Sequence, residues 1–250
     1  VPSPEAIEEV KKIAALPGIT MQGIFTHFSE ADIADKEWAH EQHSRFSAFI
    51  DALKGTGVTF NIHHCCNSAG TLELPDFHRE MIRPGIIQYG YDASKEVLVT
   101  GTKIKPVMSL RCCITHLKTI YEGDCVGYGR HFTAKGPTKI ATLPIGYADG
   151  YNRALSSKID VIVHGVRAHQ VGNICMDQCM IDVSHIPDVK VGDEVVLFGE
   201  QGSECVSADE IADTCHTIIH EITCNINRRV PRVYVQNGKI VQRLEYLTQS

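Results

Sequence analysis

The chain has 250 residues, 43% hydrophobic and 22% charged, which is enough for the core of one large domain or two ordinary ones. The net charge of −6 argues against a nucleic-acid partner, since phosphate binding needs clustered Lys and Arg and no basic run exceeds NRRVPR. No window approaches the roughly 20 apolar residues of a membrane span and no signal peptide opens the chain, so we expect a cytoplasmic protein without membrane contact.

The ten cysteines are predicted to be free. Two adjacent pairs, Cys65-Cys66 and Cys112-Cys113, are awkward to bridge, and a chain of this length needs no disulfide staples. No C-x-x-C occurs. We therefore expect buried free thiols in a reducing compartment.

Up to about residue 92, helical and strand patterns alternate. Apolar residues recur at helical spacing over 4–16, until Pro17-Gly18 ends the pattern. The next predicted elements are a short strand at 21–28, a helix at 36–53, a turn and strand at 55–64, a helix that starts within 67–74 and a strand at 80–90. Strands and helices that alternate at this pace indicate parallel β/α units.

From about residue 104 the pattern changes to short apolar runs separated by turns rich in Gly, Asp and Asn, which predicts a mostly β domain. One helix is expected over 207–223, where Ser207 and Glu210 have the spacing of a capping box. A hairpin is predicted around Asn237-Gly238. We expect the chain to divide into a partial β/α barrel at 1–97 and a β-rich domain at 98–250.

Three polar positions follow predicted strands of the first part, where parallel β/α folds collect their ligands. Ser68 lies in N-S-A-G, where a strand gives way to a helix, and a hydroxyl beside free backbone N–H groups suits phosphate. An ordinary helix cap at Ser68 is the alternative. Arg83 precedes the bend Pro84-Gly85-Ile86, and His27 ends the first strand. These residues predict a phosphate-bearing ligand.

No metal site is expected. His63-His64-Cys65-Cys66 combines metal-ligating residue types, but alternate residues of a strand point in opposite directions. His216 and His220 stand four residues apart on the predicted helix, without a further evident ligand.

The second part contributes three further candidates. Tyr128 lies between two glycines in DCVGYGRHF, and such glycines let the backbone bend or a ligand approach closely. Taken alone, Tyr147 in GYADG and Met176 in NICMDQ are typical of packing residues beside turns.

Seven motifs occur in order along the chain: THFSEAD, HHCCNSAG, MIRPGIIQYG, VGYGRHF, LPIGYADGYNR, VGNICMDQCMIDV and RRVPRVY. Together they resemble the alanine racemase family, pyridoxal 5′-phosphate (PLP) enzymes of fold type III. The resemblance implies an α/β fold, with the C-terminal part of a TIM-like (β/α)8 barrel followed by a mostly β domain. It also implies a homodimer with shared active sites. The implied activity is racemisation of L- and D-alanine by two-base proton transfer, supplying D-alanine for peptidoglycan.

The resemblance assigns the cofactor site to the first domain. Arg83 would hydrogen-bond the pyridine nitrogen of PLP and keep it unprotonated, which restrains side reactions. Asn67, Ser68 and the backbone of Gly85 and Ile86 would hold the phosphate.

The resemblance also assigns the groups that act on a small amino-acid substrate. Tyr128 resembles one of the two acid–base groups, and it would act on the partner subunit's cofactor. His27 would lie near the cofactor ring and link to the catalytic tyrosine, so that Arg83 and His27 support its acid–base role. Met176 would contact the substrate carboxylate through its N–H, and Tyr147 would narrow the entrance.

The sequence departs from the family pattern in two respects. The V-x-K-A-N-A-Y-G-H-G-like segment that carries the Schiff-base lysine does not occur, so we expect an incomplete barrel and a chain that is inactive alone. Arg228 stands two residues before V-P-R, where many alanine racemases have Tyr. Two alternatives stay open: a serine racemase of the vancomycin-resistance type, and a catalytically inactive chain that binds or dimerises.

Overall fold

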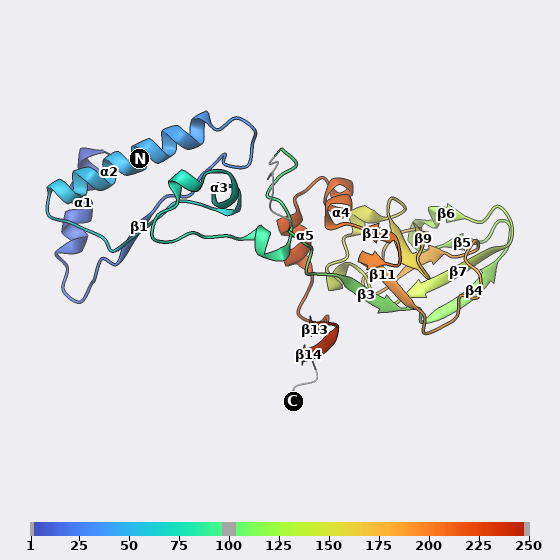
Figure 1. Cartoon of the computed structure of the whole chain (residues 1–250). Coiled ribbons are helices and arrows are strands. Elements are labelled where there is room, and N and C mark those ends of the chain that lie inside the picture. The colour runs from blue at the N-terminus through green and yellow to red at the C-terminus, as the bar shows by residue number, and fades with distance from the viewer. Residues whose placement is uncertain (1–2, 97–103, 248–250) are drawn as a thin grey trace. The chain divides into compact units, whose positions relative to one another are not determined.

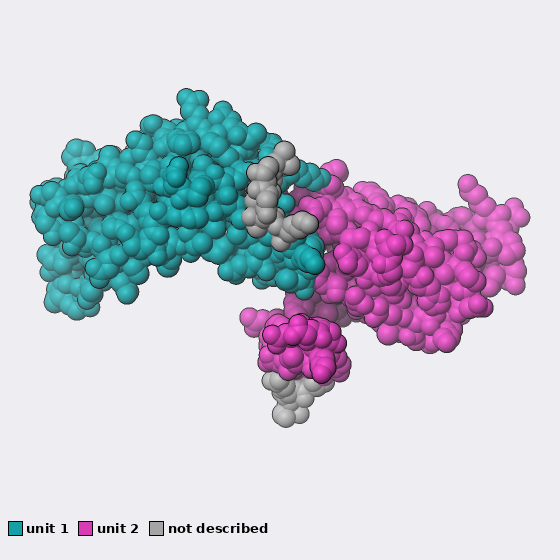
Figure 2. All heavy atoms as spheres, in the orientation of Figure 1, with its two compact units in different colours: residues 1–107 teal, residues 108–250 magenta. Residues whose placement is uncertain are grey.

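The computed structural model describes residues 3–96 and 104–247. The chain forms two compact units, Val1–Val107 and Met108–Ser250 (Figure 2). The predicted boundary between residues 97 and 98 lies outside the described residues. Each unit contains a cluster of buried apolar side chains of its own.

The first unit follows the predicted β/α order. Its described elements are α1 (Pro4–Ala14), β1 (Gly23–Phe25), α2 (Glu37–Gly55), β2 (Ile62–His64) and α3 (Ser68–Glu73), followed by 3-10 turns at Pro75–Phe77 and Ile86–Tyr89 (Figure 1). β1 and β2 pair in parallel, with Phe25 opposite His64, and α2 connects them. The three predicted helices and the first two strands are confirmed, although both strands are shorter than predicted.

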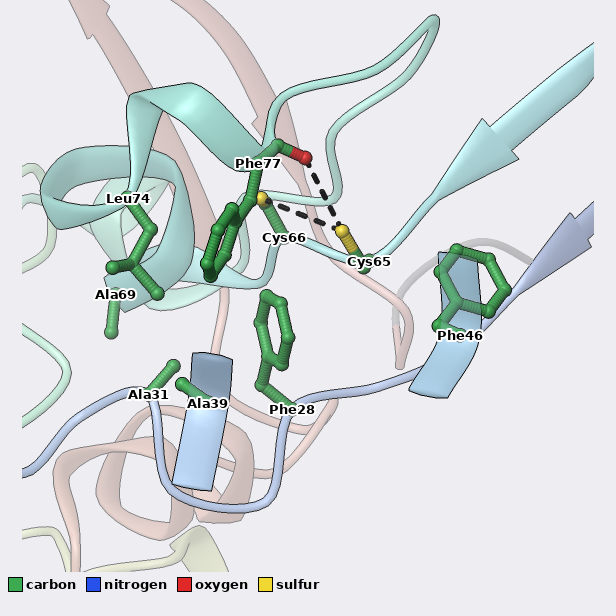
Figure 3. Close-up of a cluster of buried hydrophobic side chains, with 9 residues drawn as sticks. All are labelled: Phe28, Ala31, Ala39, Phe46, Cys65, Cys66, Ala69, Leu74 and Phe77. Atoms are coloured by element: carbon green, nitrogen blue, oxygen red, sulfur yellow. Dashed lines mark hydrogen bonds between the residues drawn. The ribbon is translucent and has the colours of Figure 1, made fainter. Parts of the chain in front are cut away.

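The core of this unit is built around the ring of Phe77. Figure 3 shows the ring of Phe28 beside it, with the two centroids 6.0 Å apart. His43 of α2 stacks on the same ring with centroids 3.9 Å apart. The Sγ atom of Cys65 lies 3.3 Å from the Phe77 carbonyl oxygen. The buried members of this core are Phe28, Ala31, Ala39, Phe46, Cys65, Cys66, Ala69, Leu74 and Phe77.

The predicted strand over 80–90 is wrong. Residues 81–85 form no strand, and Ile86–Tyr89 form a 3-10 turn instead. A strand needs a ladder of backbone donors, and Pro84 has no N–H to donate. The Arg83 amide donates to the Cys66 carbonyl at 2.9 Å, which holds this segment beside the end of β2.

The second unit is built on an eight-stranded sheet in the order β12-β11-β8-β9-β10-β7-β4, with β3 also paired to β11. These strands are β3 (Leu110–Cys113), β4 (His116–Ile120), β7 (Thr138–Leu143), β8 (Asp160–Val163), β9 (Val166–Val171), β10 (Cys179–Asp182), β11 (Glu194–Gln201) and β12 (Glu204–Val206). β5 (Cys125–Val126) and β6 (Phe132–Thr133) form a separate antiparallel pair. Residues 195–198 of β11 are fully buried, so this strand runs through the core. The prediction of a mostly β second part is confirmed.

The predicted hairpin is also confirmed. β13 (Arg232–Gln236) and β14 (Lys239–Leu244) pair in antiparallel around Asn237 and Gly238. Both turn residues have positive φ, 52° and 74°, as a type I′ turn requires.

The single helix predicted over 207–223 is two helices, α4 (Ala208–Cys215) and α5 (Ile219–Asn225). His216 ends α4 in the left-handed conformation, with φ of 55°, so it cannot continue the helix. His216 and His220 therefore do not share a helix face. The predicted cap is present, since Ser207 Oγ accepts from the Glu210 amide at 3.1 Å.

All ten cysteines are free, as predicted, but only Cys65, Cys66 and Cys179 are buried.

Among the helices that the structure describes, none combines the length and the apolar character that crossing a membrane needs.

We predict that acid destabilises the first unit through His43. Arg79 Nη2 lies 3.2 Å from His43 Nε2, and since a guanidinium only donates, this nitrogen accepts and the ring is neutral. Burial, then Arg79 and His40, lower the pKa of His43. The unfolded chain therefore takes up this proton first as the pH falls below about 6.5, and the folded state loses stability.

Thermal unfolding at pH 7.5 and 5.5 checks this prediction. The melting temperature should fall further in the unaltered protein than in His43→Gln, by about 2 to 4 °C. His116→Gln, a change at an exposed histidine of β4, is the control and should keep the full pH dependence. Equal pH dependence in His43→Gln and the unaltered protein would contradict the assignment.

Candidate active site

One cluster of predicted site residues lies where β1 and β2 end. His27 follows β1, and parallel pairing brings it to the same edge as the end of β2. The guanidinium of Arg83 donates to the Thr26 carbonyl at 2.9 Å and lies 3.1 Å from His27 Nδ1. It also hydrogen-bonds His64 Nδ1. The structure therefore brings Arg83 and His27 together, as predicted, and adds His64.

His64 is a site residue that the sequence did not reveal. The guanidinium of Arg83 has no acceptor atom, so Nδ1 of His64 and Nδ1 of His27 both accept from it. Each of these two rings is therefore neutral and carries its proton on Nε2. Burial, and then Arg83, lower the pKa of His64, which favours the neutral ring. Phe25 stacks on the His64 ring with centroids 5.2 Å apart and also lies under the Arg83 guanidinium. The signal in the sequence was only the position of His64 at a strand end.

A second group forms around the buried hydroxyl of Ser68. Asn67, not Ser68, caps α3, because Asn67 Oδ1 accepts from the Gly70 amide at 3.0 Å. Ser68 Oγ instead accepts from the Gly85 amide at 2.9 Å and lies 3.5 Å from the Ile87 nitrogen. The alternative of an ordinary cap at Ser68 is therefore wrong. The structure brings Ser68, Gly85 and Ile86 together, whereas the side chain of Asn67 is used within its own helix.

The other three predicted residues share one pocket in the second unit. This pocket has a volume of about 370 Å³. Its lining residues are Tyr128, Tyr147, Arg153, Asn173, Ile174, Cys175, Met176, Asp177 and Gln178. Tyr147 and Met176, which looked like packing positions in the sequence, therefore share one site with Tyr128. Each predicted group lies within a single unit of the chain.

Tyr128 is 77% exposed as a residue and is held at the pocket by its backbone. Asn173 Nδ2 donates to the Tyr128 carbonyl at 2.8 Å. The flanking Gly127 and Gly129 have φ of 74° and 77°, values that residues with a side chain rarely adopt. A Cβ at Gly129 would also lie 2.6 Å from His131 Nε2. The glycines around Tyr128 thus serve the turn that presents its phenol to the pocket.

Two turns are joined through their backbones to form another part of the wall. The Tyr147 amide donates to the Cys175 carbonyl and the Ala148 amide to the Met176 carbonyl, both at 3.0 Å. A Cβ at Gly146 would lie 2.2 Å from the Cys175 oxygen, so only glycine permits this approach. Tyr147 and Met176 are therefore placed by main-chain contacts rather than by their own packing.

Arg228 does not line the pocket; its guanidinium lies 5.9 Å from the centroid of the Tyr246 ring.

Within residues 3–96 and 104–247, no group of three or more His, Cys, Asp or Glu side chains could hold a metal ion.

Two family models match the chain. The model for the N-terminal domain of alanine racemase matches residues 1–93, and the model for the C-terminal domain matches residues 107–234. The chain belongs to the alanine racemase family. These matches and the likeness to solved structures confirm the predicted α/β fold, with part of a TIM-like barrel and a mostly β domain.

Relatives are similar over almost the whole chain. Alanine racemase 1 of Clostridium acetobutylicum is 45% identical over 247 residues, covering 99% of this chain and 64% of the relative. The alanine racemase of Clostridium tetani is 46% identical over 248 residues, with the same coverage of 99% and 64%. The chain thus spans about 64% of the length of these curated relatives.

Two solved structures have the same fold. An alanine racemase of Clostridium difficile 630 in complex with cycloserine is 40% identical with a TM-score of 0.93, covering 99% of this chain and 65% of that one. The alanine racemase of Bacillus anthracis with bound L-Ala-P is 36% identical with a TM-score of 0.91, covering 95% and 61%.

We predict that Gly146→Ala destabilises the second unit by about 1 to 3 kcal/mol, because the new methyl group would overlap main-chain oxygens that cannot move aside cheaply. Chemical denaturation measures this change. Gly136→Ala is the matched control, since a Cβ there meets nothing within 4 Å. If both variants are equally stable, the close backbone approach at Gly146 is not a constraint.

Proposed function

We propose that the protein containing this sequence is a PLP-dependent racemase that interconverts L- and D-alanine. The observation that carries the proposal is the shared pocket of Tyr128, Tyr147 and Met176 in a chain of the alanine racemase family. Relatives and solved structures bearing the name alanine racemase support alanine as substrate over serine. Supply of D-alanine for peptidoglycan, in the cytoplasm, is the role that fits this activity.

The residues of the first unit fit PLP. Ser68 retains a hydroxyl proton to donate, and the first N–H groups of the turn at Ile86–Tyr89 have no partner within it, so both suit a phosphate. Arg83 would donate to the pyridine nitrogen; as a permanent cation it leaves that nitrogen unprotonated. When bound, PLP stabilises negative charge that develops at the α-carbon of an amino acid.

Tyr128 would move a proton at its phenolic oxygen, on one face of the α-carbon. Phenols ionise only near pH 10 in water, so this role needs cationic or hydrogen-bonding neighbours. His27 and Arg83 are the candidates for them. Met176 would bind the substrate carboxylate through its N–H, and Tyr147 would limit the size of the substrate.

The proposed assembly is a homodimer. Tyr128, Tyr147 and Met176 form one group in the second unit, and His27, Ser68 and Arg83 form another in the first. In the arrangement that we propose, Tyr128, Tyr147 and Met176 of one subunit act at the cofactor bound by the first unit of its partner.

We predict that Tyr128→Phe lowers kcat for racemisation about 10² to 10⁴-fold, because it removes the atom that carries the proton. The absorbance of bound PLP should be unchanged. Conversion of L-alanine to D-alanine by the PLP-loaded protein, followed by chiral chromatography, provides the measurement. Tyr121→Phe, at an exposed tyrosine outside the pocket, is the control and should keep full activity. Retention of most turnover by Tyr128→Phe would refute its assigned role.

We predict that Ser68→Ala weakens PLP binding about 10- to 100-fold. The change removes one donor to the phosphate and leaves the Gly85 amide without its acceptor. Titration of the apoprotein with PLP, monitored by absorbance, gives the affinity. Ser44→Ala, at an exposed position of α2, should bind PLP normally. Equal affinity of the two variants would remove Ser68 from the proposed phosphate site.

A further inference from the structure

Three motifs of the second unit meet at one arginine. Arg229, in NINRRVPR, donates from Nε to Asp149 Oδ1 at 2.8 Å. Its Nη2 hydrogen-bonds Asp177 Oδ1. Asp149 belongs to the GYADG turn and Asp177 to NICMDQ, so one guanidinium connects the two turns that form part of the pocket wall.

Asp149 is the buried end of this connection, with a side chain only 10% exposed. Its second oxygen accepts from the Gly146 amide at 2.9 Å, and its carbonyl accepts from the Asn227 amide at 2.9 Å. A Cβ at Gly150 would lie 2.1 Å from the Asn225 oxygen, so the turn packs directly on the segment that leads to Arg229. The arginine is thus held in place by the same turn that it binds.

Asp177 is the exposed end, with a side chain 57% exposed, and it lines the pocket next to Met176. Arg229 itself is not among the lining residues. The two turns also share hydrogen bonds from the Tyr147 and Ala148 amides, but neutral hydrogen bonds are about half as strong as charge-assisted ones. The charge-assisted hydrogen bonds of Arg229 to Asp149 and Asp177 therefore add a restraint that these two amides alone do not provide.

We propose that Arg229 is a positioning residue that holds Tyr147 and Met176 in one arrangement and thereby sets the affinity of the pocket for a small amino acid. The positioning of Tyr147 and Met176 by Arg229 is supported by the contacts of Asp149 and Asp177. The identity of the ligand rests on the proposed function. A guanidinium can bind two carboxylates in a fork, and neither Lys nor Gln reproduces that geometry. Because Arg229 does not line the pocket, its loss should affect binding more than the chemical step.

Hydrogen exchange in the PLP-loaded protein tests the positioning part. In Arg229→Gln, the Tyr147 and Ala148 amides should exchange about tenfold faster, while the amides of β8–β11 keep their rates. The matched control is Arg167→Gln. Arg167 also hydrogen-bonds two carboxylates, those of Glu204 and Glu210, and none of the three lines the pocket. It should leave exchange at Tyr147 and Ala148 unchanged.

Steady-state kinetics with L-alanine test the binding part. Arg229→Gln should raise KM about tenfold and change kcat by less than about threefold, and Asp177→Asn should act in the same direction. The double variant should be no worse than Arg229→Gln, since Asp177→Asn weakens only a bond that Arg229→Gln has already removed.

Unchanged exchange at Tyr147 and Ala148 would overturn the proposal, as would faster exchange with an unaltered KM. If Arg229→Gln unfolds, the milder Asp177→Asn decides on the same two readouts. An unaltered protein that does not racemise alanine would contradict the proposed function only. The exchange arm would then still support or overturn the positioning role.

Discussion

The candidate site of the first unit depends on one side chain that donates hydrogen bonds to three acceptors. The guanidinium of Arg83 reaches Thr26 O, His27 Nδ1 and His64 Nδ1, which come from the ends of two parallel strands. Since Arg83 can only donate, both rings must offer a lone pair and stay neutral. The parallel register of β1 and β2 places these acceptors at one edge, and the Arg83 amide is fixed to Cys66 next to them.

The second unit uses a different constraint, the close approach of main chains. The turn that carries Tyr147 donates two amides to the carbonyls of Cys175 and Met176, and Gly146 is the residue that allows the contact. Arg229 also joins the same two turns by charge-assisted hydrogen bonds to Asp149 and Asp177. Tyr128 is largely exposed and Asn173 binds its backbone carbonyl, so the backbone fixes the position of this residue at the pocket. Both groups of candidate residues therefore take their positions from the ends of strands and turns, where regular pairing stops.

Features encoded by a few neighbouring residues were predicted well. Asn237-Gly238 gives its hairpin because both residues tolerate positive φ, and Ser207 caps α4 because its hydroxyl reaches an amide three residues on. Predictions failed where a distant partner or an unusual backbone conformation decides. The helix after Ser207 stops at His216, whose left-handed conformation no local pattern signals, and the expected strand over 80–90 lacks a ladder partner among the described residues. His64 was missed because its role exists only once Arg83 lies beside it.

The sequence by itself determined the family, the order of the elements and the residue types at the candidate site, because these follow from motifs and from bonds between near neighbours. Tertiary structure decided that Ser68 binds the Gly85 amide rather than capping its own helix, and that Tyr128, Tyr147 and Met176 share one pocket. It also decided that Arg229 meets Asp149 from 80 positions away. Contacts over such separations form only when a whole unit packs, since no short pattern specifies which distant segment will supply the partner.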